Sequence, residues 1–232
     1  MVVLTTSRRA VLAALVLACV AACGTSQPAG PGPPAPPTDP SSTPAREPSL
    51  SAPSAPPDGV SFTATLTGRN GAIEVSYQVV NDGTEPIVVF NGVPTVDSPN
   101  PAPAVPEAFY VIPRGGTAVR LTKQVYGLPE GVTVYAPSAI RGTVVPPGER
   151  AGERVTLTGE VRPRRPYQDV LGYSDLKPPS SVRTVELCIG VAPADKVRPR
   201  DDSDPEHPGY GHDTATANQQ YVFCSGPHPL GV

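Results

Sequence analysis

The sequence predicts an all-β fold, an antiparallel β-sandwich of about seven to nine strands. From Gly59 onward, apolar and polar residues alternate with a period of two, which is the pattern of strands with one buried face. Clusters of Gly, Pro, Asn and Asp separate the alternating segments and favour turns. No window carries an apolar stripe of helical period, and prolines recur too often for long helices.

The first two predicted strands are the clearest, at 60–67 and 73–79. Each has apolar residues at every second position and polar residues between them, so one face of the pair is expected to pack against a core. Arg69-Asn70-Gly71 is predicted to form the turn between them, because Asn-Gly adopts positive φ readily. These segments together indicate a β-hairpin at the start of the domain.

The other predicted strands continue the alternation toward the end of the chain. They lie at 87–90, 109–112, 119–125, 132–135, 155–161, 185–191 and 221–224. Turns are predicted at 81–84, 113–116 and 146–149. About 170 residues suffice for one sandwich core, so the sequence predicts one folded domain at 59–232.

The first 23 residues have the pattern of an export signal. Arg8 and Arg9 precede the uncharged apolar run 10–22, which is shorter than the about 20 residues that a transmembrane helix needs. The run ends in Val20-Ala21-Ala22-Cys23, which resembles the signal peptide of bacterial lipoproteins. The resemblance implies that residues 1–22 are removed and that a lipid on Cys23 anchors the protein to the extracytoplasmic face of the cell membrane. Arg8-Arg9 also resembles the twin-arginine export motif, so the export route stays open.

A proline-rich segment follows Cys23. Twelve of the 33 prolines lie in residues 24–58, among Ala, Ser, Thr and Gly. Such a segment has too little apolar surface to offset the entropy of ordering, so residues 23–58 are predicted to be a disordered tether. A semi-rigid stalk, a spacer of no fixed length and a docking track for a reader of Pro-rich peptides are the three interpretations.

Two segments of the predicted domain are similar to bacterial immunoglobulin-like domains. One is 73–84, a strand that ends in the turn Asn81-Asp82-Gly83-Thr84, and the other is the turn Pro146-Pro147-Gly148-Glu149 before a strand. The resemblance implies an immunoglobulin-like sandwich and no particular activity. The chain has three lysines against fifteen arginines, a bias that suggests a GC-rich genome, as in actinobacteria.

Two cysteines remain for pairing once Cys19 leaves with the signal and Cys23 is lipidated. The remaining Cys188 and Cys224 are predicted to form a disulfide, because the compartment outside the membrane is oxidising. Strand alternation puts both residues opposite the apolar positions around them, so both sulfurs are expected on one outer face of two adjacent strands. A redox couple or a soft-metal site is the alternative, without support from C-x-x-C spacing or an adjacent His.

An acidic loop late in the chain contains side chains that bind divalent metals. Four Asp, one Glu and two His lie within the thirteen residues 201–213, and carboxylates and imidazoles bind hard and borderline cations. The order of residues lacks the Gly of a calcium loop. A divalent-metal site and a solvated loop without any cofactor are therefore both open. The candidate ligands are Asp201, Asp202, Asp204, Glu206, His207, His212 and Asp213.

Two further segments are candidate binding elements. Arg162, Arg164 and Arg165 form a short basic run that either contacts phosphate, lipid headgroups or a wall polymer, or consists of solvated charges. Tyr167 and Tyr173 lie in a loop predicted to expose aromatic rings, which are good binding anchors. The same rings would alternatively cap one end of the sandwich.

Catalytic motifs are missing from the sequence. It contains no G-x-S-x-G nucleophile elbow, no H-E-x-x-H and no Gly-rich phosphate loop. Loss of Arg8 and Arg9 with the signal changes the formal charge from −3 to −5, which gives no general attraction to nucleic acid. We therefore expect a non-enzymatic binding module whose partner is an envelope protein or a wall polymer. A metal-binding lipoprotein and a cell-wall hydrolase that uses His207 or His212 are the alternatives, and the oligomeric state is left open.

Overall fold

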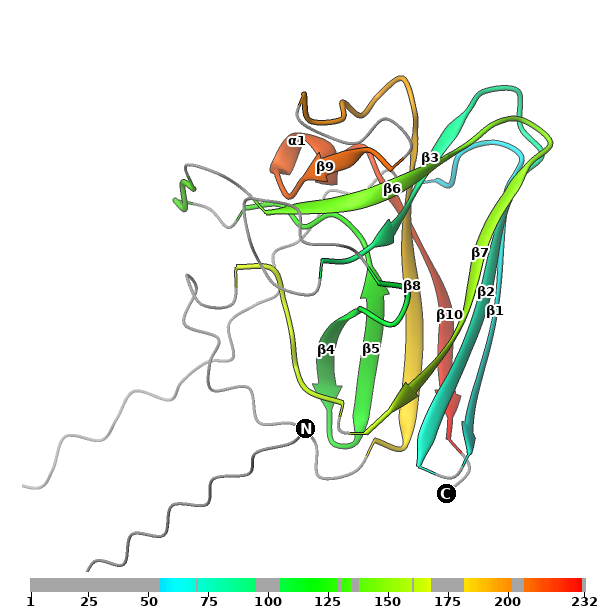
Figure 1. Ribbon diagram of the computed structural model, residues 1–232, viewed down its shortest axis with the longest axis vertical. Helices are drawn as coiled ribbons and strands as arrows, with labels where there is room; N and C mark the ends of the chain where they lie inside the picture. Colours follow the sequence, from blue (N-terminus) through cyan, green and yellow to red (C-terminus); the bar gives the residue numbers. More distant parts are fainter. Residues whose placement is uncertain are drawn as a thin grey trace, which may run out of the picture. The chain divides into compact units, whose positions relative to one another are not determined.

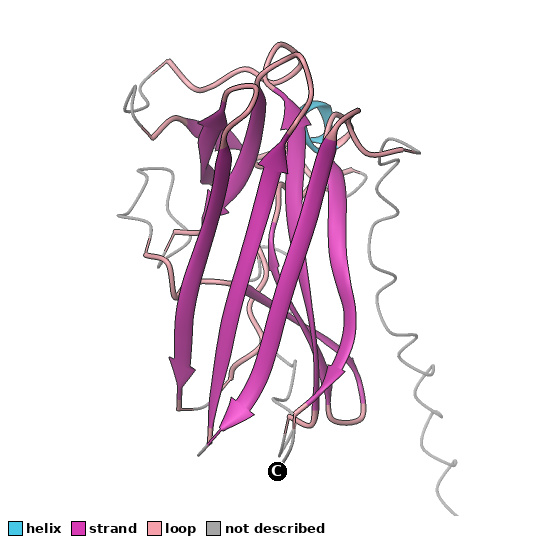
Figure 2. Ribbon diagram, turned by 90° about the vertical axis from the view of Figure 1, so that its right-hand side faces the viewer, coloured by secondary structure: helices cyan, strands magenta, loops and turns pink. Residues whose placement is uncertain are grey.

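Two β-sheets pack against each other in the computed structural model, as Figure 1 and Figure 2 show. The structure describes residues 55–69, 71–94, 105–128, 131–134, 138–159, 161–167, 182–201 and 207–230. The predicted all-β, sandwich-like class is confirmed, with nearly all strand pairs antiparallel. The predicted signal peptide, Cys23 and nearly all of the tether lie outside the described residues.

The smaller sheet contains the hairpin that the sequence predicts. Its strand order is β1-β2-β7, with β1 at Val60–Arg69, β2 at Ala72–Asn81 and β7 at Arg150–Thr158. β1 and β2 pair in unbroken register from Val60 opposite Asn81 to Arg69 opposite Ala72. Gly71 has a φ of 75° at the turn, a conformation that glycine adopts without a Cβ clash.

The larger sheet has seven strands, in the order β4-β5-β8-β3-β6-β9 with β10 on the other side of β8. The bounds are β3 Ile87–Gly92, β4 Tyr110–Gly115, β5 Ala118–Lys123, β6 Ala139–Val145, β8 Thr184–Pro193, β9 Gly209–Gly211 and β10 Tyr221–Pro229. β5 and β8 pair in parallel, which differs from the purely antiparallel prediction. The parallel pairing is possible because a long stretch of chain returns from β5 to β8, whereas a short turn would force an antiparallel pair.

Two strands share one edge of β8 end to end. β5 pairs with Thr184–Ile189 of β8, and β3 pairs with the next stretch, Gly190–Pro193. β10 occupies the opposite edge of β8. The end of β5 at Lys123 therefore lies beside the end of β3 near Asn91, and this junction positions the candidate site.

Part of the larger sheet is covered on both faces. Its inner face packs against the smaller sheet around residues such as Val75, Val89 and Leu187. Its outer face carries a second apolar cluster that includes Phe90, Tyr210 of β9 and Ala217 of α1 (Thr214–Ala217), and Figure 1 shows β9 and α1 close to β6. Strands buried on both faces have near-continuous apolar runs, and Ile87 to Phe90 are all buried. In the described ranges, no helix has the length and apolar character required to cross a membrane.

Three elements are absent from the sequence prediction, namely β6, β9 and α1. In β6, Arg141 and Gly142 interrupt the apolar alternation. Gly142 is required by packing, because a Cβ there would lie 2.6 Å from Cγ1 of Val88 and 2.8 Å from Cε2 of Tyr210. The strand predicted at 132–135 is wrong for its described part, since 131–134 form no strand. The strand predicted at 155–161 ends earlier, at Thr158.

The predicted disulfide is confirmed. Cys188 of β8 lies directly opposite Cys224 of β10, their sulfurs are bonded, and their Cα atoms are 4.2 Å apart. Neighbouring Leu187 and Ile189 point into the core between the sheets. The sulfurs therefore lie on the opposite face of two adjacent strands, as strand alternation predicts.

Candidate functional site

A buried lysine marks the junction of β5 and β3. The side chain of Lys123 has no exposed surface. Its ammonium donates to the carbonyl oxygens of Asn91 at 2.9 Å and Pro106 at 2.8 Å, and to Oε2 of Glu153 at 2.6 Å. Burial lowers the pKa of Lys123, and the charge of Glu153 opposes that shift. All three ammonium protons have acceptors, so Lys123 fixes the positions of three groups.

Glu153 reaches Lys123 from the other sheet. It lies on β7 directly opposite Tyr77 of β2, and the strand alternation of β7 turns it inward with Ala151 and Val155. The hydroxyl of Tyr77 donates to Oε2 of Glu153 at 2.8 Å. Burial and the charge of Glu153 raise the pKa of the Tyr77 phenol, so Tyr77 remains a donor. The ion pair with Lys123 thus joins the two sheets across the core.

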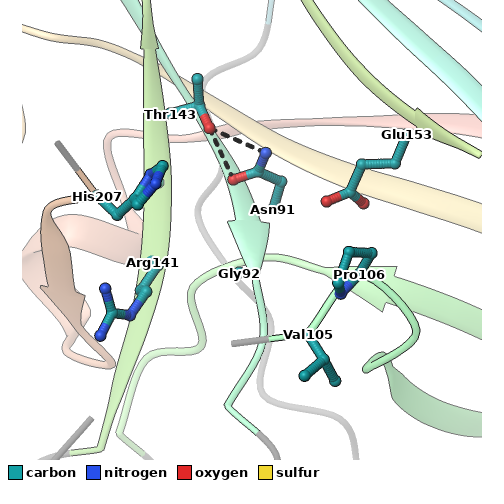
Figure 3. A pocket seen from close by; sticks show the side chains of 9 residues that line it. Asn91, Gly92, Val105, Pro106, Arg141, Thr143, Glu153 and His207 are labelled. Atoms are coloured by element: carbon teal, nitrogen blue, oxygen red, sulfur yellow. Dashed lines mark hydrogen bonds between the residues drawn. The ribbon is translucent and has the colours of Figure 1, made fainter. Parts of the chain in front are cut away.

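A polar pocket opens beside this ion pair. We call it the inter-sheet pocket; its volume is about 310 Å³. Its lining residues are Asn91, Gly92, Val105, Pro106, Arg141, Gly142, Thr143, Glu153 and His207. Figure 3 shows the Glu153 carboxylate directed toward the interior, with His207 on the opposite wall. Residues from β3, β6 and β7 therefore meet at one cavity.

Two polar groups of the pocket have unused hydrogen-bonding capacity among the described residues. Glu153 accepts the bonds from Lys123 and Tyr77 on Oε2, which leaves Oε1 as an acceptor. Asn91 exchanges hydrogen bonds with Thr143 at 3.0 and 3.1 Å, and these bonds use one of its two amide protons. Both residues line the pocket, and both contact Lys123, Asn91 through its backbone carbonyl and Glu153 through Oε2.

His212, a predicted metal ligand and catalytic candidate, lies in the outer core. Its ring is fully buried. Nδ1 accepts from the backbone N–H of Tyr126 at 3.0 Å, and Nε2 lies 2.7 Å from the Tyr110 hydroxyl. With Nδ1 accepting, the neutral ring carries its proton on Nε2 and donates to Tyr110. Burial, assisted by the charge of Arg164, lowers the pKa of His212 to about 3. Both ring nitrogens are thus engaged within the protein.

The other predicted metal ligands are not brought together where the structure describes them. His207 lines the inter-sheet pocket, whereas Asp201 and Asp213 line a separate open groove of about 720 Å³. Asp213 also caps α1, since its carboxylate accepts from the Thr216 N–H at 2.7 Å. Among the described side chains, the cluster with metal-binding geometry is Glu186 with the two disulfide sulfurs. Asp202, Asp204 and Glu206 lie outside the described residues.

Of the predicted aromatic and basic binding elements, Tyr167 and Arg164 make contacts within the domain. Tyr167 is buried, so its predicted exposure is wrong, and its hydroxyl donates to the carbonyl of His212 at 2.6 Å. Arg164 exchanges backbone hydrogen bonds with Val111, and its guanidinium donates to the carbonyl of Pro94. Arg162 lines a third cavity of about 340 Å³, also lined by Arg164. Arg165 is described, whereas Tyr173 lies outside the described residues.

Sequence reasoning missed Lys123, Glu153 and Asn91. A signal for Glu153 is present, because the inward positions of residues 150–158 are Ala151, Glu153, Val155 and Leu157. A carboxylate in an otherwise apolar row needs a partner inside the fold. The partner, Lys123, comes from a different sheet and has no spacing relationship to Glu153.

Comparisons with known proteins identify no relative. No protein-family model matches the chain, and searches of curated proteins and of solved structures gave no match. The argument for function therefore depends on the site itself.

Proposed function

We propose that the protein is a membrane-anchored lipoprotein whose β domain is a non-enzymatic binding module of the cell envelope, with the inter-sheet pocket as its binding site. The lipobox-like Val20-Ala21-Ala22-Cys23 supports the anchor, and the Pro-rich residues 24–58 support a tether. Similarity of residues 73–84 to immunoglobulin-like domains supports kinship with that class of sandwich.

The observation that carries the proposal is the fixed arrangement of the pocket. Lys123 holds Glu153 and the backbone of Asn91 in place from behind. The carboxylate of Glu153 is presented to the cavity, as Figure 3 shows. A binding site whose polar groups are already held in position loses little entropy when a ligand binds.

The engagement of Lys123 and His212 within the protein supports binding over catalysis. Lys123 uses all three of its protons within the protein, one of them on Oε2 of Glu153. A general base needs an oxygen or nitrogen atom that is free to accept a proton from the substrate and whose pKa suits that transfer. His212, one of the two candidate catalytic histidines of the sequence, uses both nitrogens in the outer core.

The binding proposal is tested by photo-crosslinking in intact cells. A crosslinking amino acid replaces His207, which is exposed and lines the pocket, and in a matched control it replaces Thr65, which is exposed on β1. An adduct of defined mass from position 207 and none from position 65 is expected. The same adducts from both positions, or none from either, would contradict the pocket as binding site.

The anchor is tested separately by fractionation. The wild-type protein is expected in the membrane fraction and to incorporate labelled fatty acid, and Cys23→Ala is expected to lose both properties. Recovery of Cys23→Ala in the membrane with unchanged label would remove Cys23 as the anchor.

A further inference from the structure

We propose that the inter-sheet pocket binds a neutral saccharide unit through two adjacent hydroxyl groups. This inference rests on the proposed function and names the ligand class of the same site. Four features carry it: paired hydrogen-bonding groups, a compensated charge, the size of the cavity and its apolar side.

The hydrogen-bonding groups of the pocket suit a pair of hydroxyls. Oε1 of Glu153 is an acceptor, and the second amide proton of Asn91 is a donor. A hydroxyl both donates and accepts, so one hydroxyl donates to Glu153 while its neighbour on the next carbon accepts from Asn91. A simple amine has no acceptor for the Asn91 proton once it is protonated, and a simple carboxylate has no donor for Glu153.

The charge at the Glu153 wall favours a neutral ligand, and Arg141, which also lines the pocket, has an interaction of its own. Lys123 compensates Glu153 at 2.6 Å, so the pair has no net charge. An ammonium ligand would add a second cation beside Lys123, and a carboxylate ligand would place a like charge against Glu153. Hydrogen bonds to the ionised Glu153 are still strong, because a charged acceptor binds a hydroxyl more tightly than a neutral one does.

The size of the cavity agrees with one sugar ring. An apolar cavity of about 150 Å³ in another protein holds benzene, a six-atom ring. The inter-sheet pocket is about 310 Å³, which leaves room for a six-membered ring with its hydroxyl groups. Val105, Pro106 and the backbone of Gly92 line the pocket without polar side chains and provide a surface for the C–H groups of the ring.

NMR of the ¹⁵N-labelled full chain with the native disulfide tests the proposal directly. The side-chain amide of Asn91 gives its own signals, and the amide of Asn81 is a matched control, because it is bonded to Glu85 and Val145 in the core. The probes are the methyl glycosides of glucose, mannose and galactose, with maltotriose for a sugar within a polymer. Ethylamine, propionate and cyclohexanol are the control probes.

At least one methyl glycoside or maltotriose is expected to shift the Asn91 amide and the backbone signals of Gly92 and Thr143 in a saturable manner, and to leave the Asn81 amide in place. Cyclohexanol, ethylamine and propionate are expected to bind at least tenfold more weakly. Binding of a methyl glycoside but not of maltotriose indicates that the pocket takes a single sugar unit, and binding of both indicates that it also takes a glucose unit linked to others.

Asn91→Ala is expected to weaken the glycoside at least tenfold, and Thr65→Ala, on the outer face of β1, is expected to have no effect. If Asn91→Ala does not fold, the saccharide proposal is tested by the shifts of the Asn91 and Asn81 amide signals in the wild-type protein. No saturable shift of Asn91 with any sugar, or equal binding of propionate or ethylamine, would overturn the saccharide proposal. If position 207 gives a crosslinked adduct in cells but no sugar binds in the NMR experiment, the binding function still stands and only the saccharide is excluded as its ligand.

Discussion

Glu153 of β7 and Lys123 of β5 form an ion pair of 2.6 Å that crosses from one sheet to the other. The Lys123 side chain is wholly buried, and that of Glu153 is 17% exposed. One end of the pair therefore belongs to the core, and the other end belongs to the inter-sheet pocket. In the proposed function, binding would therefore depend on the same two residues as the stability of the domain.

Removing one partner of this pair is expected to destabilise the domain strongly. Glu153→Gln leaves the charge of Lys123 buried without its counterion, which costs about 3–5 kcal/mol in the free energy of unfolding. The double variant Lys123→Met with Glu153→Gln removes both charges and is expected to recover much of that loss. Urea denaturation of Glu153→Gln, Lys123→Met and the double variant measures the coupling free energy between the two residues.

The Arg120–Glu186 pair is the matched control. Its atoms are 2.8 Å apart, and its side chains are 19% and 20% exposed. Glu186→Gln is expected to cost about 0–1 kcal/mol, because water screens this pair. Equal losses for Glu153→Gln and Glu186→Gln would contradict a special role for burial.

The domain is expected to lose stability below about pH 6.5 through His212. Burial lowers the pKa of His212 from 6.5 to about 3, so the unfolded chain binds a proton that the folded protein excludes. The contribution is complete above pH 6.5 and decreases by about 1.4 kcal/mol per pH unit as the pH falls toward 3. Unfolding curves from pH 7 to pH 4 are expected to show a steeper decline for the wild type than for His212→Gln. If the stability of the wild type and of His212→Gln declined equally as the pH falls, His212 would not be the source of the pH dependence.

Gly142→Ala is expected to destabilise the domain by about 1–3 kcal/mol, because a Cβ at this position would lie within 3 Å of two core side chains. Gly127→Ala is the control. The nearest atoms to a Cβ at Gly127 are 3.5 Å away, in ordinary contact, so little change is expected. Thermal unfolding measures both variants, and a loss at Gly127 as large as that at Gly142 would count against the packing explanation.

The disulfide is expected to contribute about 4 kcal/mol to the free energy of unfolding, because it closes a loop with a sequence separation of 36. Cys188→Ala with Cys224→Ala is expected to lose that amount in urea unfolding. A reductant is expected to lower the stability of the wild type and to leave the double variant unchanged. A response of the double variant to reductant would show that the reductant acts elsewhere.

The hairpin β1–β2 and the disulfide could be predicted because each depends on local alternation. In contrast, β6 could not be predicted, because Arg141 and Gly142 break the pattern for reasons that lie elsewhere: Arg141 lines the pocket, and Gly142 accommodates Val88 and Tyr210. The second apolar cluster, on the outer face of the larger sheet, could not be predicted either. A strand that is buried on both faces, such as β3, gives a continuous apolar run without a period that identifies its partners.

Candidate site residues were harder to predict than the fold. The acidic neighbours of His207 in sequence predict a metal site, whereas the structure places His207 in the lining of the inter-sheet pocket, on the wall opposite Glu153. The loop 201–213 predicts His212 as a metal ligand or catalytic residue, but its two hydrogen-bond partners are Tyr110 and Tyr126, far away in sequence. Spacing within a loop does not report on which layer of a sandwich a side chain enters.

The larger sheet has an apolar layer on each side, and this has a consequence for how ligand preference could change. β3 and β6 present Asn91 and Thr143 to the pocket and Val88, Phe90 and Ile140 to the outer core. A substitution in the outer core that tilts either strand alters the width of the pocket without touching its lining. Selection for a different ligand can therefore act on residues that the ligand never meets.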